Sequence, residues 1–487
     1  MVQPIFVAGE WRQGRGEVYA SRYPADDSVN AEIAAASVAD VEEAIEAAEA
    51  ARRRPDWAGL KPHERAAVLY RIAALIRSRA EELAQLQRRD NGKPINETRA
   101  LVASAAGTFQ FFAAACETLE ETLTPPRGDY LTMSVHEPLG VIAAITPWNS
   151  PIASEAQKLA PALAAGNGVI VKPAEVTPLA ALELGRICQE AGVPKGVVSV
   201  LPGKGSVIGD AIVRHPLVKK VSFTGGTTTG RALARLAADK LMPVTLELGG
   251  KSPTIVFPDA DLDHAVNGVL YGIFSSSGES CIAGSRLFVH ESVRAEFLER
   301  LVAKTNALRV GDPADERTQM GPLITSEHRE SIERYVQLGL DEGGKLLAGG
   351  ERPRGGLYDR GWFYRPTILA GLTNDARISQ EEIFGPVLVA MPFRDEADLI
   401  AQANDSVFGL AAGIWTRDYK RAWRVARALE AGTVWINTYK QFSISTPFGG
   451  IKDSGVGVEK GRLGILQYKH QKSLYWGLNE QPLAWAD

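Results

Sequence analysis

Apolar and polar positions in the first hundred residues follow the spacing of helices. Ser37 and Asp40 stand three residues apart, as in a capping box, and open an alanine- and glutamate-rich segment that continues to about residue 54. A second helix is predicted from about residue 62. Its apolar positions recur at intervals of three, four and seven residues, at Leu69, Ile72, Ile76 and Leu83. We predict that this helix ends at Asn91, before a glycine and a proline.

From about residue 140 the pattern changes to short apolar runs separated by helical segments. The runs at 141–145, 169–171, 197–201 and 218–223 predict buried strands. Strands that alternate with helices indicate βαβ units and a parallel sheet. A second series of apolar runs, also separated by helical segments, begins near residue 252 and includes 254–256, 286–290 and 435–437. We therefore predict two α/β domains.

Two further segments have the alternating pattern of exposed strands. Residues 130–135 alternate clearly, and residues 473–476 form a shorter and weaker candidate. An exposed strand leaves backbone N–H and C=O groups free to pair. These segments could therefore pair with another subunit.

Composition narrows the class of protein. A chain of 487 residues exceeds the usual domain length of about 100 to 200 residues, which indicates two to four domains. Three cysteines without a Cys-x-x-Cys pair, and seven scattered histidines, predict a reducing compartment and no metal site. A net charge of -4 without long basic runs argues against nucleic acid as a partner. We expect a cytoplasmic protein with no signal peptide, because the N-terminus lacks a cationic segment followed by a long apolar one. We expect no membrane partner, because no apolar run approaches the roughly 18 residues of a spanning helix.

Cys281 has the surroundings expected of a reactive thiol. It lies in a segment of small and polar residues bounded by Gly278 and Gly284, and Glu247 precedes a Leu-Gly-Gly-Lys sequence upstream. This pattern is typical of a cysteine nucleophile with a carboxylate base. Most free cysteines are instead small buried hydrophobic residues. The local sequence leaves both interpretations open.

Two glycine-rich loops have the position of dinucleotide-binding loops. Residues 203–209 and 223–230 each follow a predicted strand and open a helix, so that backbone N–H groups could approach a pyrophosphate. The spacing of the first loop is one residue too long for G-x-G-x-x-G. Considered singly, either loop is equally well explained as a tight turn with an N-cap.

Seven short motifs together resemble the aldehyde dehydrogenase superfamily, in order and over nearly the whole chain. They are TPWN at 146–149, KPAE at 172–175, FTGG at 223–226, ELGGK at 247–251, GxxC at 278–281, EIFGP at 382–386 and PFGG at 447–450. Each motif is modestly specific, but their common order leaves little room for chance. The resemblance implies an α/β fold with a Rossmann-type cofactor domain (1–117 and 139–249), an α/β catalytic domain (250–450) and a small β oligomerisation element (118–138 and 451–487).

The resemblance also implies roles for individual residues. Cys281 attacks the aldehyde carbon, and the Asn149 amide and the Cys281 N–H stabilise the oxyanion that forms. Glu247 is the general base for hydrolysis of the thioester. Lys172 is counted with these catalytic residues. The implied reaction is oxidation of an aldehyde to the free acid.

The implied cofactor is NAD, with NADP possible. Lys172 and Glu175 match the positions that hold the adenosine ribose, where a carboxylate repels a 2′-phosphate. Glu382 and Phe384 match the residues that position the nicotinamide ribose and ring. The other expected cofactor contacts are Ile145, Trp148, Gly205, Gly209, Phe223, Thr224, Gly225, Gly226, Thr229 and Leu248. Many relatives carry serine where this chain has Gly226.

The substrate is predicted from one helix face. Ser150, Ser154 and Gln157 share that face, at positions that often carry aromatic or bulky apolar residues in relatives acting on simple aldehydes. We therefore expect a polar aldehyde, either hydroxylated or carboxylated as in a semialdehyde. The other expected tunnel residues are Ser280, Ile282, Phe442 and Phe448. A homodimer or homotetramer is implied. The alternatives are an enzyme that transfers the acyl group to coenzyme A and a non-catalytic protein on the same fold.

Overall fold

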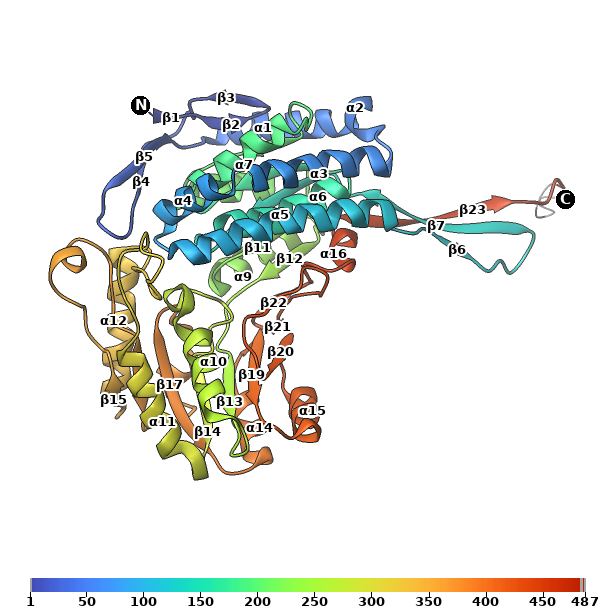
Figure 1. Ribbon diagram of the computed structural model, residues 1–487. Coiled ribbons are helices and arrows are strands. Elements are labelled where there is room, and N and C mark those ends of the chain that lie inside the picture. Colours follow the sequence, from blue (N-terminus) through green and yellow to red (C-terminus); the bar gives the residue numbers. More distant parts are fainter. Residues whose placement is uncertain (1, 482–484, 486–487) are drawn as a thin grey trace.

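Two separate sheets form the body of the protein (Figure 1). The computed structural model describes residues 2–481 and 485. The first sheet has the order β22-β12-β11-β8-β9-β10-β2-β3. Its five central strands are parallel: β8 (Val141–Ile145), β9 (Gly168–Lys172), β10 (Val198–Val200), β11 (Val218–Thr224) and β12 (Val244–Glu247). Antiparallel edge strands complete it: β2 (Ile5–Val7), β3 (Glu10–Arg12) and β22 (Gly455–Val456).

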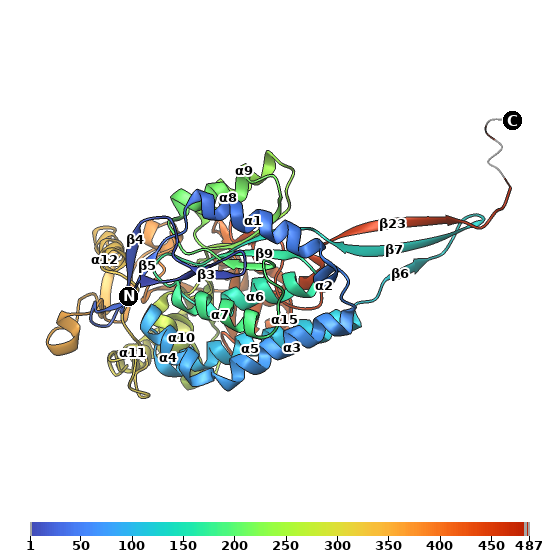
Figure 2. The ribbon, with the colours of Figure 1, turned by 90° about the horizontal axis from the view of Figure 1, so that it is seen from above.

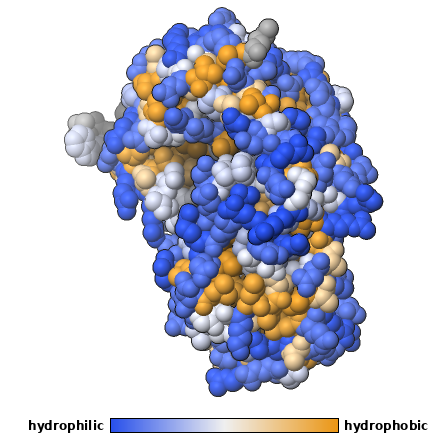
Figure 3. All heavy atoms as spheres, turned by 90° about the vertical axis from the view of Figure 1, so that its left-hand side faces the viewer, coloured by the Kyte–Doolittle hydropathy of each residue, from blue (hydrophilic) through white to orange (hydrophobic). Residues whose placement is uncertain are grey.

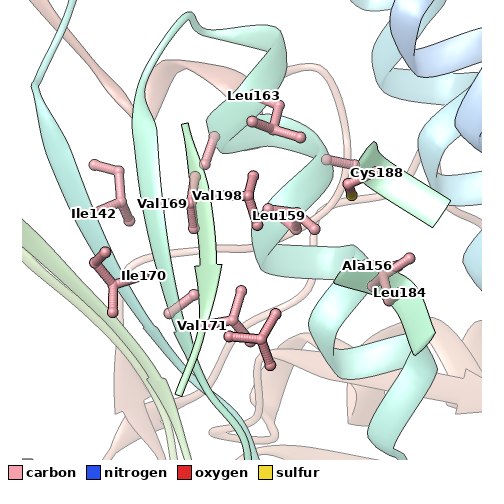
Figure 4. Packing of buried hydrophobic residues seen from close by; sticks show 14 of the residues in the cluster. Ile142, Ala156, Leu159, Leu163, Val169, Ile170, Val171, Leu184, Cys188 and Val198 are labelled. Carbon is pink, nitrogen blue, oxygen red and sulfur yellow. The ribbon is translucent and has the colours of Figure 1, made fainter. Parts of the chain in front are cut away.

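Helices cover both faces of the first sheet (Figure 2). One face carries α1 (Val38–Arg53), α8 (Asp210–Arg214) and α9 (Thr227–Ala238). The other carries α3 (Pro62–Ser78), α4 (Ala80–Asn91), α5 (Ile95–Thr118), α6 (Pro151–Ala164) and α7 (Leu179–Glu190). Because both faces are covered, every residue of β8 and β9 is buried, which explains why all of them except Lys172 are apolar or glycine. Figure 4 shows Cys188 of α7 within this core, near Leu184.

The second sheet has the order β15-β16-β17-β14-β13-β19-β20. Its strands are β13 (Pro253–Val256), β14 (Arg286–His290), β15 (Lys345–Ala348), β16 (Thr367–Ala370), β17 (Val387–Phe393), β19 (Ala411–Trp415) and β20 (Thr433–Ile436). Alternate side chains enter two cores. Leu287 and Val289 pack with α10 (Leu262–Phe274) and α11 (Glu291–Asn306), whereas Phe288 packs with α12 (Ser326–Asp341), α14 (Glu396–Asn404) and α15 (Tyr419–Ala428). The predicted mixed α/β architecture is confirmed.

Smaller elements join or extend these sheets. They are β1 (Val2–Gln3), β4 (Val18–Arg22), β5 (Val29–Ala34), α2 (Pro55–Ala58), α13 (Arg377–Gln380), β18 (Phe408–Gly409), β21 (Ile451–Lys452) and α16 (Leu463–Leu466). The side of the molecule nearest α12 and β15 has a largely hydrophilic surface interrupted by separate hydrophobic patches (Figure 3). Such a mixture is ordinary for a folded protein.

A three-stranded ribbon projects from the body (Figures 1 and 2). It has the order β23-β7-β6, with β6 (Thr122–Thr124), β7 (Tyr130–Pro138) and β23 (Lys469–Gly477). Strands β7 and β23 pair antiparallel along nine residues each. Both exposed strands predicted from the sequence therefore exist, and they pair with each other. The outer edge of β23 has no partner strand among the described residues.

Two expectations about helices were wrong. The helix predicted from residue 62 to 91 is divided into α3 and α4 at Arg79, whose backbone leaves the helical region (φ -111°, ψ 21°). The Arg79 side chain forms ion pairs with Glu183 and Glu190 of α7, a tertiary contact that an apolar stripe does not encode. Helix α5 is long and apolar enough to cross a membrane by length and composition, although no such segment was expected. Half of its most apolar window is buried inside the protein, and the helix packs against α3 and α6.

Candidate active site

A cavity of about 440 Å³ lies where four parallel strands of the first sheet end. The last residues of these strands are Ile145, Lys172, Thr224 and Glu247, and all four line it. The carboxyl ends of parallel strands share one edge of a sheet, which is where α/β proteins bind ligands. The second domain contributes Cys281, His328, Glu382 and Phe384 to the same cavity. The site is thus built from both α/β parts of the chain.

Cys281 is partly exposed, whereas Cys116 and Cys188 are buried in the core. It follows a turn in which Ser276 and Ser277 have positive φ angles of 59° and 56°. A Cβ atom on Gly250 would lie 2.4 Å from the Cys281 carbonyl oxygen, so only glycine fits there. Burial raises the pKa of the Cys281 thiol to about 12, and the nearby carboxyls Glu382 and Glu247 act in the same direction. The resting thiol is therefore neutral, and its activation requires a base.

Glu247 is a buried carboxyl with no hydrogen-bond partner for either oxygen among the described residues. Burial raises its pKa well above the usual value, and the negative charge of Glu459 raises it further. Lys158 and Lys460 oppose this shift. Glu459 is itself paired with the Lys158 ammonium at 2.5 Å. A carboxyl in this setting binds a proton more readily than an exposed one, and its oxygens are free to exchange that proton.

Asn149 is positioned beside the Cys281 turn. It closes the loop between β8 and α6, and its side-chain Nδ2 donates to the backbone carbonyl of Glu279, 2.9 Å away. Because Glu279 precedes Cys281 by two residues, this bond ties the amide to the segment that carries the thiol. A primary amide has two N–H donors. The second can therefore serve an oxygen atom bound near Cys281.

Two helices begin at the part of the cavity formed by the first domain. Gly226 is the N-cap of α9, and Gly205 begins a π-helical turn, η1 (Gly205–Gly209), that leads into α8. No atom lies within 4 Å of a Cβ built on Gly226, so the backbone N–H groups there are open to a ligand. Helix N-termini of this kind bind phosphate groups. The cavity therefore fits a dinucleotide pyrophosphate.

Lys172 and Glu382 lie along the cavity, in different domains. The buried Lys172 ammonium donates to the Pro173 carbonyl at 2.6 Å, and burial lowers its pKa to about 8. Glu382 accepts from the Gly250 N–H at 2.9 Å, and burial raises its pKa to about 7. A Cβ atom on Gly249 would lie 2.3 Å from a Glu382 oxygen. The glycine pair upstream of Cys281 thus makes room for both the thiol segment and this carboxyl.

His328 lines the cavity but was not found from the sequence. Its ring packs edge-on against Trp148 at 5.5 Å, and its Nε2 lies 2.8 Å from the carbonyl oxygen of Phe384. Phe384 also packs edge-on against Trp148 and has a positive φ of 56°. Burial lowers the pKa of His328, so the ring is neutral at pH 7. A single histidine on a helix carries no sequence signal for such a position.

Most of the expected cofactor and catalytic residues line this one cavity, but some do not. Glu175 and Gly209 lie outside its lining, as do Ser150, Ser154, Gln157, Ser280 and Ile282. Phe442 and Phe448 line a separate cavity of about 390 Å³. The roles of all these residues stay predictions. No group of three or more histidine, cysteine or acidic side chains suited to a metal occurs in the described part of the chain.

Comparisons with known proteins place the chain in a family. The model of the aldehyde dehydrogenase family matches residues 11–474. A betaine aldehyde dehydrogenase of Bacillus subtilis is 40% identical over 489 residues, covering 100% of this chain and 99% of the relative. A betaine aldehyde dehydrogenase of Rhizobium etli is 44% identical over 477 residues, covering 97% of each chain. The structure of a Bacillus cereus aldehyde dehydrogenase in complex with NAD+ superposes with a TM-score of 0.96 at 39% identity, covering 98% of this chain and 97% of the other. A Staphylococcus aureus betaine aldehyde dehydrogenase in complex with NAD+ gives 0.97 at 36% identity, covering 100% and 97%. The chain belongs to the aldehyde dehydrogenase family.

Proposed function

We propose that the protein oxidises a polar aldehyde to the free carboxylic acid with NAD as the oxidant. The observation that carries this proposal is that Cys281, Glu247 and Asn149 line the same cavity as the open N-terminus of α9. A thiol nucleophile, a carboxyl base and an oxyanion donor then face a site that fits a dinucleotide. Membership of the aldehyde dehydrogenase family supports the same reaction.

The first half of the reaction forms a bond to Cys281. The thiol loses its proton to Glu247 in its ionised form, and the sulfur attacks the aldehyde carbon. The resulting thiohemiacetal oxyanion is stabilised by the free Asn149 N–H and by the Cys281 backbone N–H. Loss of one such donor costs roughly 2.7 to 4 kcal/mol of transition-state stabilisation. When bound, NAD supplies the hydride acceptor that converts the thiohemiacetal to a thioester.

The second half releases the acid. Ionised Glu247 takes a proton from water, which attacks the thioester and frees Cys281. A base dedicated to hydrolysis weighs against the alternative of acyl transfer to coenzyme A. Intact Cys281, Glu247 and Asn149 weigh against a non-catalytic role. Lys172 and Glu175 are assigned to the adenosine ribose, where Glu175 disfavours a 2′-phosphate and hence NADP.

The proposed aldehyde is polar because the first turns of α6 carry Ser150, Ser154 and Gln157 on one face. None of these side chains offers the apolar surface that a long alkyl aldehyde would need. We also propose that the protein acts in the cytoplasm as a homodimer or homotetramer.

The test is the initial rate of NADH and NADPH formation across short aliphatic, aromatic, hydroxylated and carboxylated aldehydes, with Cys281→Ala as the control. Turnover with NAD preferred, polar aldehydes ahead of hexanal and activity lost in the control is expected. A best rate with hexanal or decanal would contradict the substrate assignment. Acyl-coenzyme A as the main product when coenzyme A is added would contradict hydrolysis.

A further inference from the structure

Three lysines surround the Cys281 turn outside the cofactor cavity. The Lys93 Nζ lies 3.4 Å from the carbonyl oxygen of Ser276, and the Lys440 Nζ donates to the Ser275 hydroxyl at 2.8 Å. Both serines belong to the turn that leads to Cys281. Lys460 follows Glu459, whose backbone pairs with Phe448. Burying an ammonium group is costly unless a partner stabilises it, so a cluster of three requires an explanation.

Lys460 lies against aromatic rings rather than against polar partners. Its side chain is only 7% exposed, yet it forms no hydrogen bond or ion pair with any residue that the structure describes. Its Nζ lies 3.9 Å from the centre of the Phe442 ring and 5.3 Å from that of Phe448. The neighbouring carboxylate Glu459 is paired with Lys158 instead. Lys460 also has a positive φ of 60°, a conformation that costs free energy in a residue with a side chain.

Lys440 and Lys93 are also without an ion pair among the described residues. Glu97 is the carboxylate that raises the pKa of both most strongly, and its two oxygens accept from the backbone N–H and the hydroxyl of Ser276, at 2.8 Å each. Lys440, like Lys460, has a positive φ, of 54°. Lys440 and Lys460 therefore carry ammonium groups on residues with positive φ, and both lie close enough to Cys281 for a thiolate there to raise their pKa.

The aromatic rings nearby do not offer a site for a cation. Phe442 and Phe448 pack edge to face at 5.4 Å and line the cavity of about 390 Å³. Rings of this kind bind quaternary ammonium groups through their faces. Here the ammonium of Lys460 already lies against both rings, and a second cation would be repelled. Betaine aldehyde, after which several relatives are named, carries such a cation.

We propose that the aldehyde substrate carries a carboxylate at the end remote from its carbonyl, and that Lys460 and Lys440 bind this carboxylate. Aldehydes with a quaternary ammonium group are then excluded from the site. The inference rests on the proposed function and specifies its substrate class. A charge-assisted hydrogen bond is roughly twice as strong as a neutral one, and a buried ammonium without a partner gains most from it. The polar face of Ser150, Ser154 and Gln157 suits the same substrate.

The pH dependence of substrate binding provides a signature that a structural role would lack. Burial lowers the pKa of Lys440 and of Lys460 to about 8, opposed by Glu97 for the first and by Glu459 and Glu247 for the second. The ammonium forms therefore predominate below pH 8 and are lost above it. Lys93 faces Lys440 and repels it. The KM for a carboxylated aldehyde should rise as the pH rises through about 8, whereas the KM for a neutral aldehyde of equal length should not rise in parallel.

The experiment compares three aldehydes with a four-carbon chain that carry a carboxylate, a primary amide or a trimethylammonium group at the far end, namely 4-oxobutanoate, 4-oxobutanamide and 4-trimethylammoniobutanal. Rates of NADH formation are measured for the wild type, Lys460→Met, Lys440→Met, Lys460→Arg and Lys420→Met. The last variant removes an exposed lysine of α15 on the same domain. The carboxylate should have the highest wild-type kcat/KM, by at least about tenfold over the cation.

Each lysine-to-methionine change should raise the KM for the carboxylate about tenfold more than it raises the KM for the amide. Lys460→Arg should recover part of the loss, and Lys420→Met should behave as wild type. The amide rate shows that each variant is folded and competent. A carboxylate no better than the amide, a preferred cation, or equal losses on all three aldehydes would overturn the inference. Absence of turnover with any aldehyde, in a protein that binds NADH, would instead contradict the proposed function.

Discussion

Burial raises the pKa of two thiols in this protein, Cys188 and Cys281, to about 12. Their neighbours give them different chemistry. Cys188 is surrounded by apolar side chains, whereas Cys281 is partly exposed to a cavity that also contains Glu247 and Asn149. A neutral thiol becomes a nucleophile only when a base can take its proton. Cys281 is therefore distinguished from Cys188 by the cavity it shares with Glu247, and not by a lower pKa of its thiol.

The pH dependence of turnover follows from the environment of Glu247. Its raised pKa keeps the carboxyl protonated at low pH, and only the ionised form can act as a base. The steady-state kcat should therefore increase with pH across the titration of this group. Glu247→Gln should lower kcat by about 100- to 10,000-fold and remove that dependence. The measurement is kcat as a function of pH for both proteins.

A rapid-mixing experiment separates the two roles of Glu247. If its main role is hydrolysis of the thioester, Glu247→Gln should still release a burst of NADH, approaching one equivalent per subunit, because hydride transfer precedes hydrolysis. Loss of both the burst and the steady-state rate, with NADH binding retained, would assign Glu247 to activation of Cys281. A steady-state rate equal to that of the wild type would contradict either role.

Many residues that line the cavity could be predicted from the sequence, because they belong to short motifs. Asn149, Lys172, Glu247, Cys281 and Glu382 each stand in a motif that could be matched in the sequence, and all five line the cavity. His328, Lys440 and Lys460 were not found, because each is a common residue type outside any chemically suggestive pattern. Their significance depends on contacts with Trp148, Ser275 and Phe442 that only the folded chain brings together.

At the scale of elements, strands were easier to predict than helix boundaries. Strand β8 and residues 168–171 of β9 are buried on both faces, so their sequences are continuous apolar runs. The apolar stripe of α3 and α4 continues through Leu83 despite the break at Arg79. The break coincides with ion pairs to α7, which lies about a hundred residues away along the chain. Such contacts are invisible to local periodicity.

The loops at the strand ends provide a matched pair of glycine substitutions. A Cβ atom on Gly249 would lie 2.3 Å from Glu382, whereas one on Gly226 meets no atom within 4 Å. Neither residue has a positive φ, so alanine causes no backbone strain at either position. Gly249→Ala should displace Glu382 and lower kcat/KM for NAD about 10- to 100-fold. Gly226→Ala should change it by less than about threefold, because the methyl group meets no protein atom and the backbone N–H proposed to face the pyrophosphate is retained.

The two variants are compared by steady-state kinetics with NAD varied, and by thermal denaturation as a check on folding. Equal losses in both would mean that the space around each glycine does not decide the effect. A normal kcat/KM for Gly249→Ala would show that Glu382 is not needed in its present position.

At the scale of the whole molecule, the two sheets and the ribbon have different relations to solvent. The sheets are covered by helices, whereas the ribbon leaves large apolar side chains exposed. Leu123, Tyr475, Trp476 and Leu478 are each more than 60% exposed. Together with the unpaired edge of β23, this concentration of apolar surface is typical of a subunit interface. The sequence indicated both strands, but not that they would pair with each other and project from the body.

If the ribbon joins subunits, charged residues on it should separate them. Tyr475→Lys with Trp476→Lys places two ammonium groups where the exposed fractions are 73% and 67%, without removing any backbone hydrogen bond of β23. The matched control is Tyr419→Lys with Trp423→Lys on α15, where the corresponding fractions are 76% and 67%. The ribbon variant should have a smaller mass by light scattering, and the control should have the mass of the wild type. Because burying an unpaired charge at an interface is costly, even partial dissociation at micromolar concentration should be detectable. An unchanged mass for the ribbon variant, or equal dissociation of both, would show that the subunits associate through another surface.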